Sequence, residues 1–263
     1  MLFRSAAEFD YVIVGAGSAG CVLAARLTED RDVTVLLLEA GGSDWNPLVS
    51  IPIGIGKLHQ HRYYDWGFFH EPTPNVAGRS LVAARGKLLG GSSSINNMAY
   101  VRGHRGDYDR WAARGYRGWS YADVLPYFRR CEDWEGGADA WRGAGGPLKT
   151  EYLHNPDPVV ADWMQACRDA GFPQTDDYNG AVTEGFGQAQ STVGNGRRSS
   201  AAVAYLRPAR RRPNLTVVTR APATRVLLEK SRAVGVEYLR RGRPVRAMAK
   251  REVLLSEIGR AHV

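Results

Sequence analysis

The first forty residues alternate between apolar runs and a helical pattern, in the order strand, turn, helix, strand. Residues 11–14 read Tyr-Val-Ile-Val, a short apolar run typical of a buried parallel strand. From Cys21 to Glu29 the residues favour a helix, with apolar positions at 23, 24 and 27. A second apolar run over residues 33–38 predicts a second buried strand.

A glycine-rich turn joins the first strand to the helix. Residues 15–20 match the pattern GxGxxG: Gly15 permits a tight turn, Gly17 lets the backbone approach a pyrophosphate, and Gly20 brings helix and strand close. The helix N-terminus offers free N–H groups to phosphates. Glu39 lies 19 residues after the last glycine and can accept hydrogen bonds from ribose hydroxyls. These features predict dinucleotide binding. Since no arginine stands beside Glu39 to hold a 2′-phosphate, NADP is disfavoured, while FAD and NAD both stay open.

Local signals predict further helices and strands. Residues 120–123 resemble a capping box that opens a helix through about Cys131, and Asp157-Pro158 opens a second helix that stops at Gly171. The second helix has an apolar stripe of Val159, Trp163 and Cys167, which indicates packing. Residues 63–69 are rich in aromatics and are predicted to form a buried strand or, equally, a ligand contact. Residues 199–206 predict a short helix closed by Pro208. Five β-like runs predict strands: 215–219, 224–228, 234–238, 245–249 and 252–255.

Composition excludes several classes of protein. With 44% hydrophobic and 24% charged residues the chain is an ordinary globular one, and no apolar stretch is long enough to span a membrane. The formal charge of +8 comes mainly from arginine, and the densest cluster, residues 207–212, lacks the interleaved aromatics of a nucleic-acid site. We therefore expect a solvated loop there and no nucleic-acid partner. Cys21, Cys131 and Cys167 lie far apart, so we expect no metal site and a cytoplasmic location, with peripheral association at the inner face of the membrane as an alternative.

A second glycine motif lies within residues 85–103. A flexible linker is one interpretation of residues 90–94, but apolar residues flank them on both sides. A tight turn that opens a short helix, with Ser92, Ser93 or Ser94 as its N-cap, fits better. Small residues there would let a flat ring approach the backbone.

Together these motifs resemble the amino-terminal part of the glucose-methanol-choline (GMC) flavoprotein oxidoreductases, in particular the choline dehydrogenase-like alcohol dehydrogenases. The first family signature runs from Gly86 through Gly90-Gly91-Ser92-Ser93 and Ile95-Asn96 to Asp109, and the resemblance covers residues 8 to about 256. It implies an α/β fold: a three-layer ββα Rossmann-like FAD-binding domain with part of a second α+β substrate domain, truncated.

The resemblance also implies the cofactor and its residues. FAD is expected rather than NAD, and it is expected to be bound non-covalently, because Ile95 stands where some members carry a flavin-linking histidine. The implied cofactor-binding residues are Gly15, Gly17, Ser18, Ala19, Gly20, Glu39, Ala40, Trp66, Arg85, Gly86, Leu88, Gly90, Gly91, Ser92, Asn96, Asn97, Met98, Ala99 and Val226. Of these, Asn96 to Ala99 would border the isoalloxazine, and the backbone of Val226 would contact adenine.

The implied activity is oxidation of a choline-like or primary alcohol to an aldehyde by hydride transfer to flavin N5. A separate acceptor (a quinone, another carrier or oxygen) would then take the electrons. A hydroxynitrile-lyase-like flavoprotein and a non-catalytic nucleotide-binding module are the alternatives. No residue of this chain is assigned as catalytic, since the family's catalytic histidine comes from the carboxy-terminal half, and we expect the chain alone to be inactive. His104 is expected in a surface turn. The expected segments are 8–150 and 213–256 in the FAD-binding domain, 151–212 in the substrate domain, and 257–263 as a non-native tail.

Overall fold

The computed structural model describes residues 7–154 and 157–257. Most of the expected tail, residues 258–263, lies outside the described residues. The described residues form two compact units, one from residues 7–97 and 200–257 and the other from residues 98–154 and 157–199. The sequence-based segments instead kept residues 98–150 with the FAD-binding domain.

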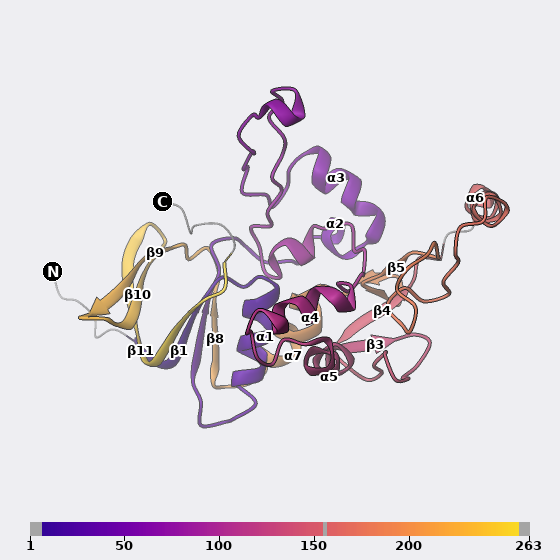
Figure 1. The fold of residues 1–263 in the computed structure, drawn as a ribbon. Coiled ribbons are helices and arrows are strands. Elements are labelled where there is room, and N and C mark those ends of the chain that lie inside the picture. The colour runs from indigo at the N-terminus through magenta and orange to yellow at the C-terminus, as the bar shows by residue number, and fades with distance from the viewer. Residues whose placement is uncertain (1–6, 155–156, 258–263) are drawn as a thin grey trace. The chain divides into compact units, whose positions relative to one another are not determined.

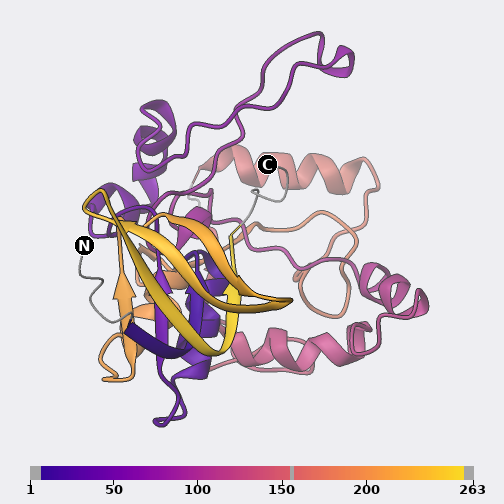
Figure 2. The ribbon, with the colours of Figure 1, turned by 90° about the vertical axis from the view of Figure 1, so that its left-hand side faces the viewer.

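A six-stranded sheet forms the centre of the first unit, in the order β8-β2-β1-β11-β10-β9 (Figure 1). Its parallel part is built from β1 (Ala7–Val14), β2 (Val35–Leu38) and β8 (Leu215–Val218), with β1 also pairing in parallel with the second half of β11 (Arg243–Leu255). An antiparallel meander continues the sheet through β10 (Arg232–Arg240) and β9 (Ala223–Glu229). Figure 2 looks onto this yellow-orange meander.

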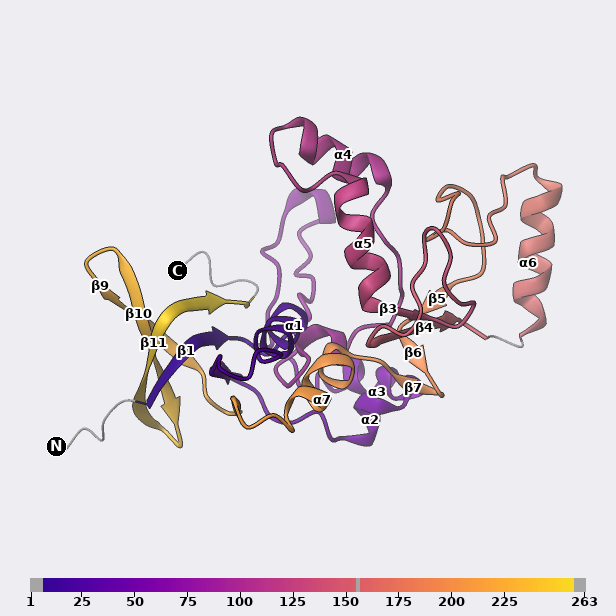
Figure 3. The same cartoon turned by 90° about the horizontal axis from the view of Figure 1, so that it is seen from below.

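The first unit has three layers, as expected from the sequence. On one face of the parallel strands, Val12 and Leu36 pack in a buried cluster with Val236 and Ala247 of the meander. On the other face lies α1 (Ser18–Leu27), whose Gly20 approaches the Leu37 side chain. Figures 1 and 3 show α1 beside α7 (Arg207–Ala209), which a single π-helical turn precedes (Ala202–Leu206). Burial on both faces explains why β1 and β2 are continuous apolar runs.

Shorter elements complete the first unit. These are α2 (Pro47–Ser50), α3 (Ile55–Gln60) and three 3₁₀ turns at Pro52–Gly54, Pro74–Val76 and Gly91–Ser94.

The second unit combines helices with short strands. The helices are α4 (Arg105–Ala113), α5 (Tyr121–Cys131) and α6 (Pro158–Asp169); the strands are β3 (Glu132–Trp134), β4 (Leu148–Tyr152), β5 (Gln190–Ser191), β6 (Val193–Gly194) and β7 (Arg197–Arg198). The predicted capping box of α5 is confirmed, because Ser120 Oγ accepts from the Asp123 N–H and the Asp123 carboxylate accepts from the Ser120 N–H. Asp157 likewise caps α6.

Several local predictions are wrong. Residues 63–69 form no buried strand: isolated bridges such as Phe69 to Val82 hold an exposed arm instead. The runs 245–249 and 252–255 are one strand, because β11 continues through Lys250 and Arg251. Pro208 does not close the helix: the helical backbone continues from the π-helical turn at Ala202–Leu206 into α7 (Arg207–Ala209).

The apolar stripe of α6 is packed only in part within its own unit, through an edge-to-face contact of Trp163 with Phe186. Val159 is 63% exposed and Trp163 56% exposed, and no residue of α6 is buried. Amphipathic spacing shows which residues share a face of the helix, but it does not show what that face contacts.

Candidate cofactor-binding site

The first glycine turn presents the unblocked N-terminus of α1. Gly15 has φ +94°, and a Cβ on Gly20 would lie 1.9 Å from the Gly15 carbonyl oxygen, so both positions require glycine. Gly17 is the N-cap residue, and no side chain caps the helix or adds an acidic group to its first turn. Ser18 and Ala19 are exposed. The first N–H groups of the helix are therefore available to an anion.

Glu39 lies at the carboxyl end of β2, next to this turn. Its Oε2 accepts from the Ala16 N–H at 2.9 Å, and its Oε1 accepts from the Gly41 N–H at 2.8 Å. Burial raises the pKa of Glu39, and these two N–H groups oppose the rise. Each carboxylate oxygen keeps a second lone pair, which leaves acceptor capacity for a ribose hydroxyl.

Backbone contacts fix the chain after Glu39 at the edge of the sheet. The Glu39 carbonyl accepts from the Ala221 N–H, and the Gly41 carbonyl accepts from the Arg220 N–H, so the segment after β8 lies beside Ala40. A Cβ on Gly41 would lie 1.9 Å from the Lys87 carbonyl oxygen. That close approach brings the second glycine motif to the end of β2.

The second motif folds back on itself. Gly90 (φ +87°) and Gly91 (φ +53°) are left-handed, and a Cβ on Gly86 would lie 2.3 Å from the Gly91 carbonyl oxygen. The Gly86 N–H donates to Ser92 Oγ at 3.1 Å. Gly90, not a serine, is the N-cap of the 3₁₀ turn at Gly91–Ser94, so the expected serine N-cap is wrong. Glycine takes that position because its backbone is left-handed.

The two glycine motifs touch. A Cβ on Gly91 would lie 2.8 Å from the Gly17 Cα, and the Gly90 N–H donates to the Ala16 carbonyl at 2.8 Å. Among the described residues other than its chain neighbours, a Cβ on Gly17 itself would meet a single atom within 4.0 Å, the Ser256 carbonyl oxygen. The space at Gly17 therefore lies open beside the end of α1, where a pyrophosphate would need room. The residues present fit an adenine dinucleotide.

The remaining predicted cofactor-binding residues lie in several parts of the structure. Leu88 is buried. The Arg85 carbonyl accepts from the Trp66 N–H. Asn96 and Asn97 follow the 3₁₀ turn and are exposed. Met98 and Ala99 belong to the second unit. Val226 pairs with Val236 in the meander, away from Glu39 along the strand order.

Sequence reasoning gave no role to two residues at this site. The Ala16 N–H donates to Glu39, and the Ala16 carbonyl accepts from the Gly90 N–H. Because both contacts use the backbone, no side-chain pattern in the sequence reveals them. Lys87 places its Nζ 4.3 Å from the centre of the Trp66 ring. The sequence gives no sign that Lys87 contacts Trp66, which lies 21 positions before it.

Two histidines of the described chain make contacts that fix the local structure. His59 Nε2 lies 2.8 Å from the Ile95 carbonyl oxygen, a structural contact. His104 is exposed, as expected, but it caps α4 rather than forming a surface turn, with Nδ1 accepting from the Gly106 N–H. Within residues 7–154 and 157–257, no group of three potential metal ligands occurs.

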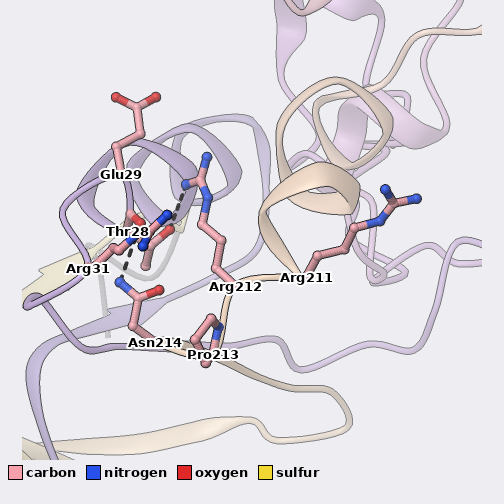
Figure 4. Close-up of a pocket in the computed structure, with 7 residues that line it drawn as sticks. All are labelled: Thr28, Glu29, Arg31, Arg211, Arg212, Pro213 and Asn214. Atoms are coloured by element: carbon pink, nitrogen blue, oxygen red, sulfur yellow. Dashed lines mark hydrogen bonds between the residues drawn. The ribbon is translucent and has the colours of Figure 1, made fainter.

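A pocket of about 510 Å³ lies at the opposite, C-terminal end of α1 (Figure 4). Arg212 donates to Thr28 Oγ1 there and to the Ala25 carbonyl, and Asn214 donates to the Thr28 carbonyl. These groups bind the last carbonyls of the helix. The expectation of a solvated loop at 207–212 is therefore wrong in part, because Arg207 also pairs with the buried Asp44.

Comparison with known proteins agrees with this geometry. Residues 9–259 match the family model "GMC oxidoreductase". The chain is 49% identical over 250 residues to an oxygen-dependent choline dehydrogenase of Brucella ovis, a match that covers 95% of this chain and 45% of that protein. An oxygen-dependent choline dehydrogenase of Sinorhizobium fredii is 48% identical, with the same coverage. The chain spans about half the length of the curated relatives it matches.

Solved structures show the same fold. Pyridoxine 4-oxidase from Mesorbium loti superposes with a TM-score of 0.89 at 36% identity, over 94% of this chain and 49% of that one. Formate oxidase from Aspergillus oryzae, in a study of FAD modification, superposes with a TM-score of 0.86 at 28% identity, over 96% and 46%.

The chain belongs to the GMC oxidoreductase family. Two of the solved neighbours carry FAD in their names, a formate oxidase studied for FAD modification and an FAD-dependent oxidoreductase from Chaetomium thermophilum, and this supports FAD as the cofactor. No helix in the described part of the chain is both long and apolar enough to cross a membrane.

Proposed function

We propose that this chain is the FAD-binding part of an alcohol oxidoreductase, with a choline-like or primary alcohol as the substrate of the whole enzyme. The observation that carries the proposal is the contact between Gly17 and Gly91, which brings two distant small-residue turns to the open end of α1. A single extended dinucleotide can lie along both turns. The identity to choline dehydrogenases supports the choice of substrate.

The chain's own residues would bind and orient the cofactor. The N–H groups of Ser18 and Ala19 would donate to the pyrophosphate, and Glu39 would accept from the ribose of the adenosine. The small residues of the second motif, with Asn96 and Asn97, would border the ring system. Bound FAD would supply the hydride acceptor, at N5, for oxidation of the alcohol to an aldehyde. A quinone, another carrier or oxygen would take the electrons afterwards.

The binding mode would be non-covalent. Ile95 is buried in an apolar cluster with Val49, Leu58 and Leu88 and has no atom that could bond to a flavin. No residue of this chain is assigned to proton removal, so the chain by itself would bind FAD without oxidising alcohols.

Titration of the chain with FAD, followed by flavin fluorescence, tests the proposal. We expect saturable binding that Gly17→Ala weakens by at least tenfold, because the added methyl group occupies the open space at the end of α1. The Gly17 backbone is extended (φ −74°), so alanine is tolerated there without strain. The matched control is Gly56→Ala, where the added Cβ would meet no atom of the described residues within 4 Å apart from its chain neighbours, and it should leave binding unchanged. Equal affinity of the two variants would contradict the proposal.

A further inference from the structure

Lys87 brings a positive charge into the candidate cofactor site. Its side chain is half-buried, and its Nζ lies 4.3 Å from the centre of the Trp66 ring. Within residues 7–154 and 157–257, this ammonium group forms neither a hydrogen bond nor a salt bridge. Its N–H groups are therefore available to a ligand.

Backbone contacts on two sides hold Lys87 in this place. Its N–H donates to the Tyr64 carbonyl at 2.6 Å, and its carbonyl oxygen would lie 1.9 Å from a Cβ on Gly41. Gly41 comes shortly after Glu39 in the chain, and Tyr64 comes shortly before Trp66. Lys87 thus joins the segment that follows β2 to the segment that carries Trp66.

The Trp66 ring orients the Lys87 side chain. Trp66 is itself held by its backbone, because its N–H donates to the Arg85 carbonyl at 3.0 Å. The attraction between an ammonium group and a ring face is electrostatic and occupies one side of the ammonium group, so N–H groups remain for an anion on the other side. Arg85 differs in this respect, since its Nη1 donates to the Ala84 carbonyl at 2.7 Å.

The charge of Lys87 also acts on Glu39. Burial raises the pKa of Glu39, the N–H groups of Gly41 and Ala16 oppose the rise, and the Lys87 ammonium group opposes it as well. A cation affects a carboxylate in this way at short range, because solvent and salt screen more distant charges. Lys87 therefore lies close to the residue that would accept from the adenosine ribose.

The charge of an adenine dinucleotide favours a cation at this position. The diphosphate is doubly negative, whereas the N-terminus of α1 supplies only about half a positive charge. Glu39 adds a negative charge beside the same turn, where it accepts from the Ala16 N–H. The Lys87 ammonium group offsets the charge of Glu39 and leaves the site attractive to phosphate.

We propose that Lys87 binds the diphosphate of the dinucleotide, with its ammonium group oriented by the Trp66 ring. A lysine ammonium group is a compact point charge that suits phosphate oxygens. Trp66 is a positioning residue in this arrangement, since it acts through Lys87. The inference rests on the proposed function and assigns the diphosphate a side-chain partner in addition to the backbone of the first glycine turn. Lys87 precedes the second glycine turn, which begins at Gly90.

Calorimetric titration of the 263-residue chain with FAD and with ADP tests the role of Lys87. The two ligands share the diphosphate, so K87M should weaken both by the same factor of about tenfold, through loss of a charged hydrogen bond. Methionine is long enough to keep the packing on Trp66. K87R keeps the charge and should bind both ligands nearly as tightly as the unaltered chain.

Two further substitutions separate this role from a structural one. Lys57 is exposed on α3, and K57M removes the same charge there, so it should bind like the unaltered chain. W66L should weaken ADP several-fold, because the ammonium group loses its orientation. The same substitution should have little effect when residue 87 is already methionine, since the two residues act as a pair.

The results distinguish this inference from the proposed function. If the unaltered chain binds FAD and K87M binds as tightly as K57M, Lys87 has no part in binding and the proposed function stands. Weakening of FAD but not of ADP would place Lys87 against another part of the cofactor and would also overturn the inference. A loss in K87R equal to that in K87M would show that Lys87 acts through packing rather than charge. No binding of either ligand by the unaltered chain would refute the inference and the proposed function together.

Discussion

Glu132 and Arg142 form a two-point salt bridge in the interior of the second unit. Nη2 of Arg142 lies 2.7 Å from Oε1 of Glu132 and Nε lies 3.0 Å from Oε2, and both side chains are at most 1% exposed. Arg102 donates to the same carboxylate, and Asp177 provides Arg142 with a second acid. One carboxylate thus holds two buried guanidinium groups, an arrangement that is stable only while all the partners are present.

Removal of the Glu132 charge should destabilise the second unit strongly. We expect Glu132→Gln to lower the free energy of unfolding by about 3–5 kcal/mol, because two buried cations lose their shared counter-ion. Urea unfolding followed by circular dichroism measures this loss.

Asp133 offers a control at the next position. It pairs with Lys149 at the surface, so Asp133→Asn should cost about 1 kcal/mol or less. If the two variants unfolded at the same urea concentration, the buried network would not hold the unit together.

The raised pKa of Glu39 predicts pH-dependent cofactor binding. Because burial places this pKa above that of an ordinary glutamate, lowering the pH protonates Glu39 before exposed carboxylates and turns one of its two acceptor oxygens into a donor. FAD affinity should therefore fall as the pH decreases through the raised pKa. Glu39→Gln should bind about tenfold more weakly at neutral pH and should lose this pH dependence.

Fluorescence titrations with FAD over a pH series measure the effect of Glu39. The exposed Glu29→Gln serves as the control and should behave like the unaltered chain. Unaltered affinity of Glu39→Gln at every pH would show that Glu39 does not contact the cofactor.

The apolar surroundings of Ile95 predict that bound flavin is released on denaturation. After FAD loading and removal of free cofactor, acid precipitation should leave all the flavin in the supernatant, since Ile95, buried among apolar side chains, has no atom that could bond to it. Absorbance of the two fractions measures the release. Yellow colour retained in the washed precipitate would show a covalent bond and refute the prediction.

Local sequence patterns predicted the helices and strands that depend mainly on the residues within them. Two apolar runs, a GxGxxG turn and a capping box at Ser120 gave β1, β2, α1 and the start of α5, because the residues that cause each element lie within it. The β11 strand was divided in the prediction, since Lys250 and Arg251 interrupt its apolar pattern. Its continuity depends on pairing with β1 on one side, which a short window cannot reveal.

Long-range contacts could not be predicted in this way. The approach of Gly91 to Gly17, the pairing of Arg142 with Glu132 and Asp177, and the hydrogen bonds of Arg212 at the end of α1 all join distant segments. Family resemblance indicated that the two glycine motifs share one cofactor, whereas propensity alone did not bring them together. The prediction that the apolar stripe of α6 packs rested on spacing within the helix, and spacing does not show which residues lie opposite the stripe.

The most direct test of the central claim compares the binding of ADP and FAD by three proteins in isothermal titration calorimetry. ADP probes the first glycine turn alone, whereas FAD would reach both motifs. We predict that the unaltered chain binds one FAD more tightly than ADP, that Gly17→Ala weakens both ligands, and that Asn97→Ala, an exposed position after the second motif, weakens FAD alone by about tenfold. Equal affinities for FAD and ADP, unchanged by Asn97→Ala, would show that the second motif takes no part in binding and would contradict the account.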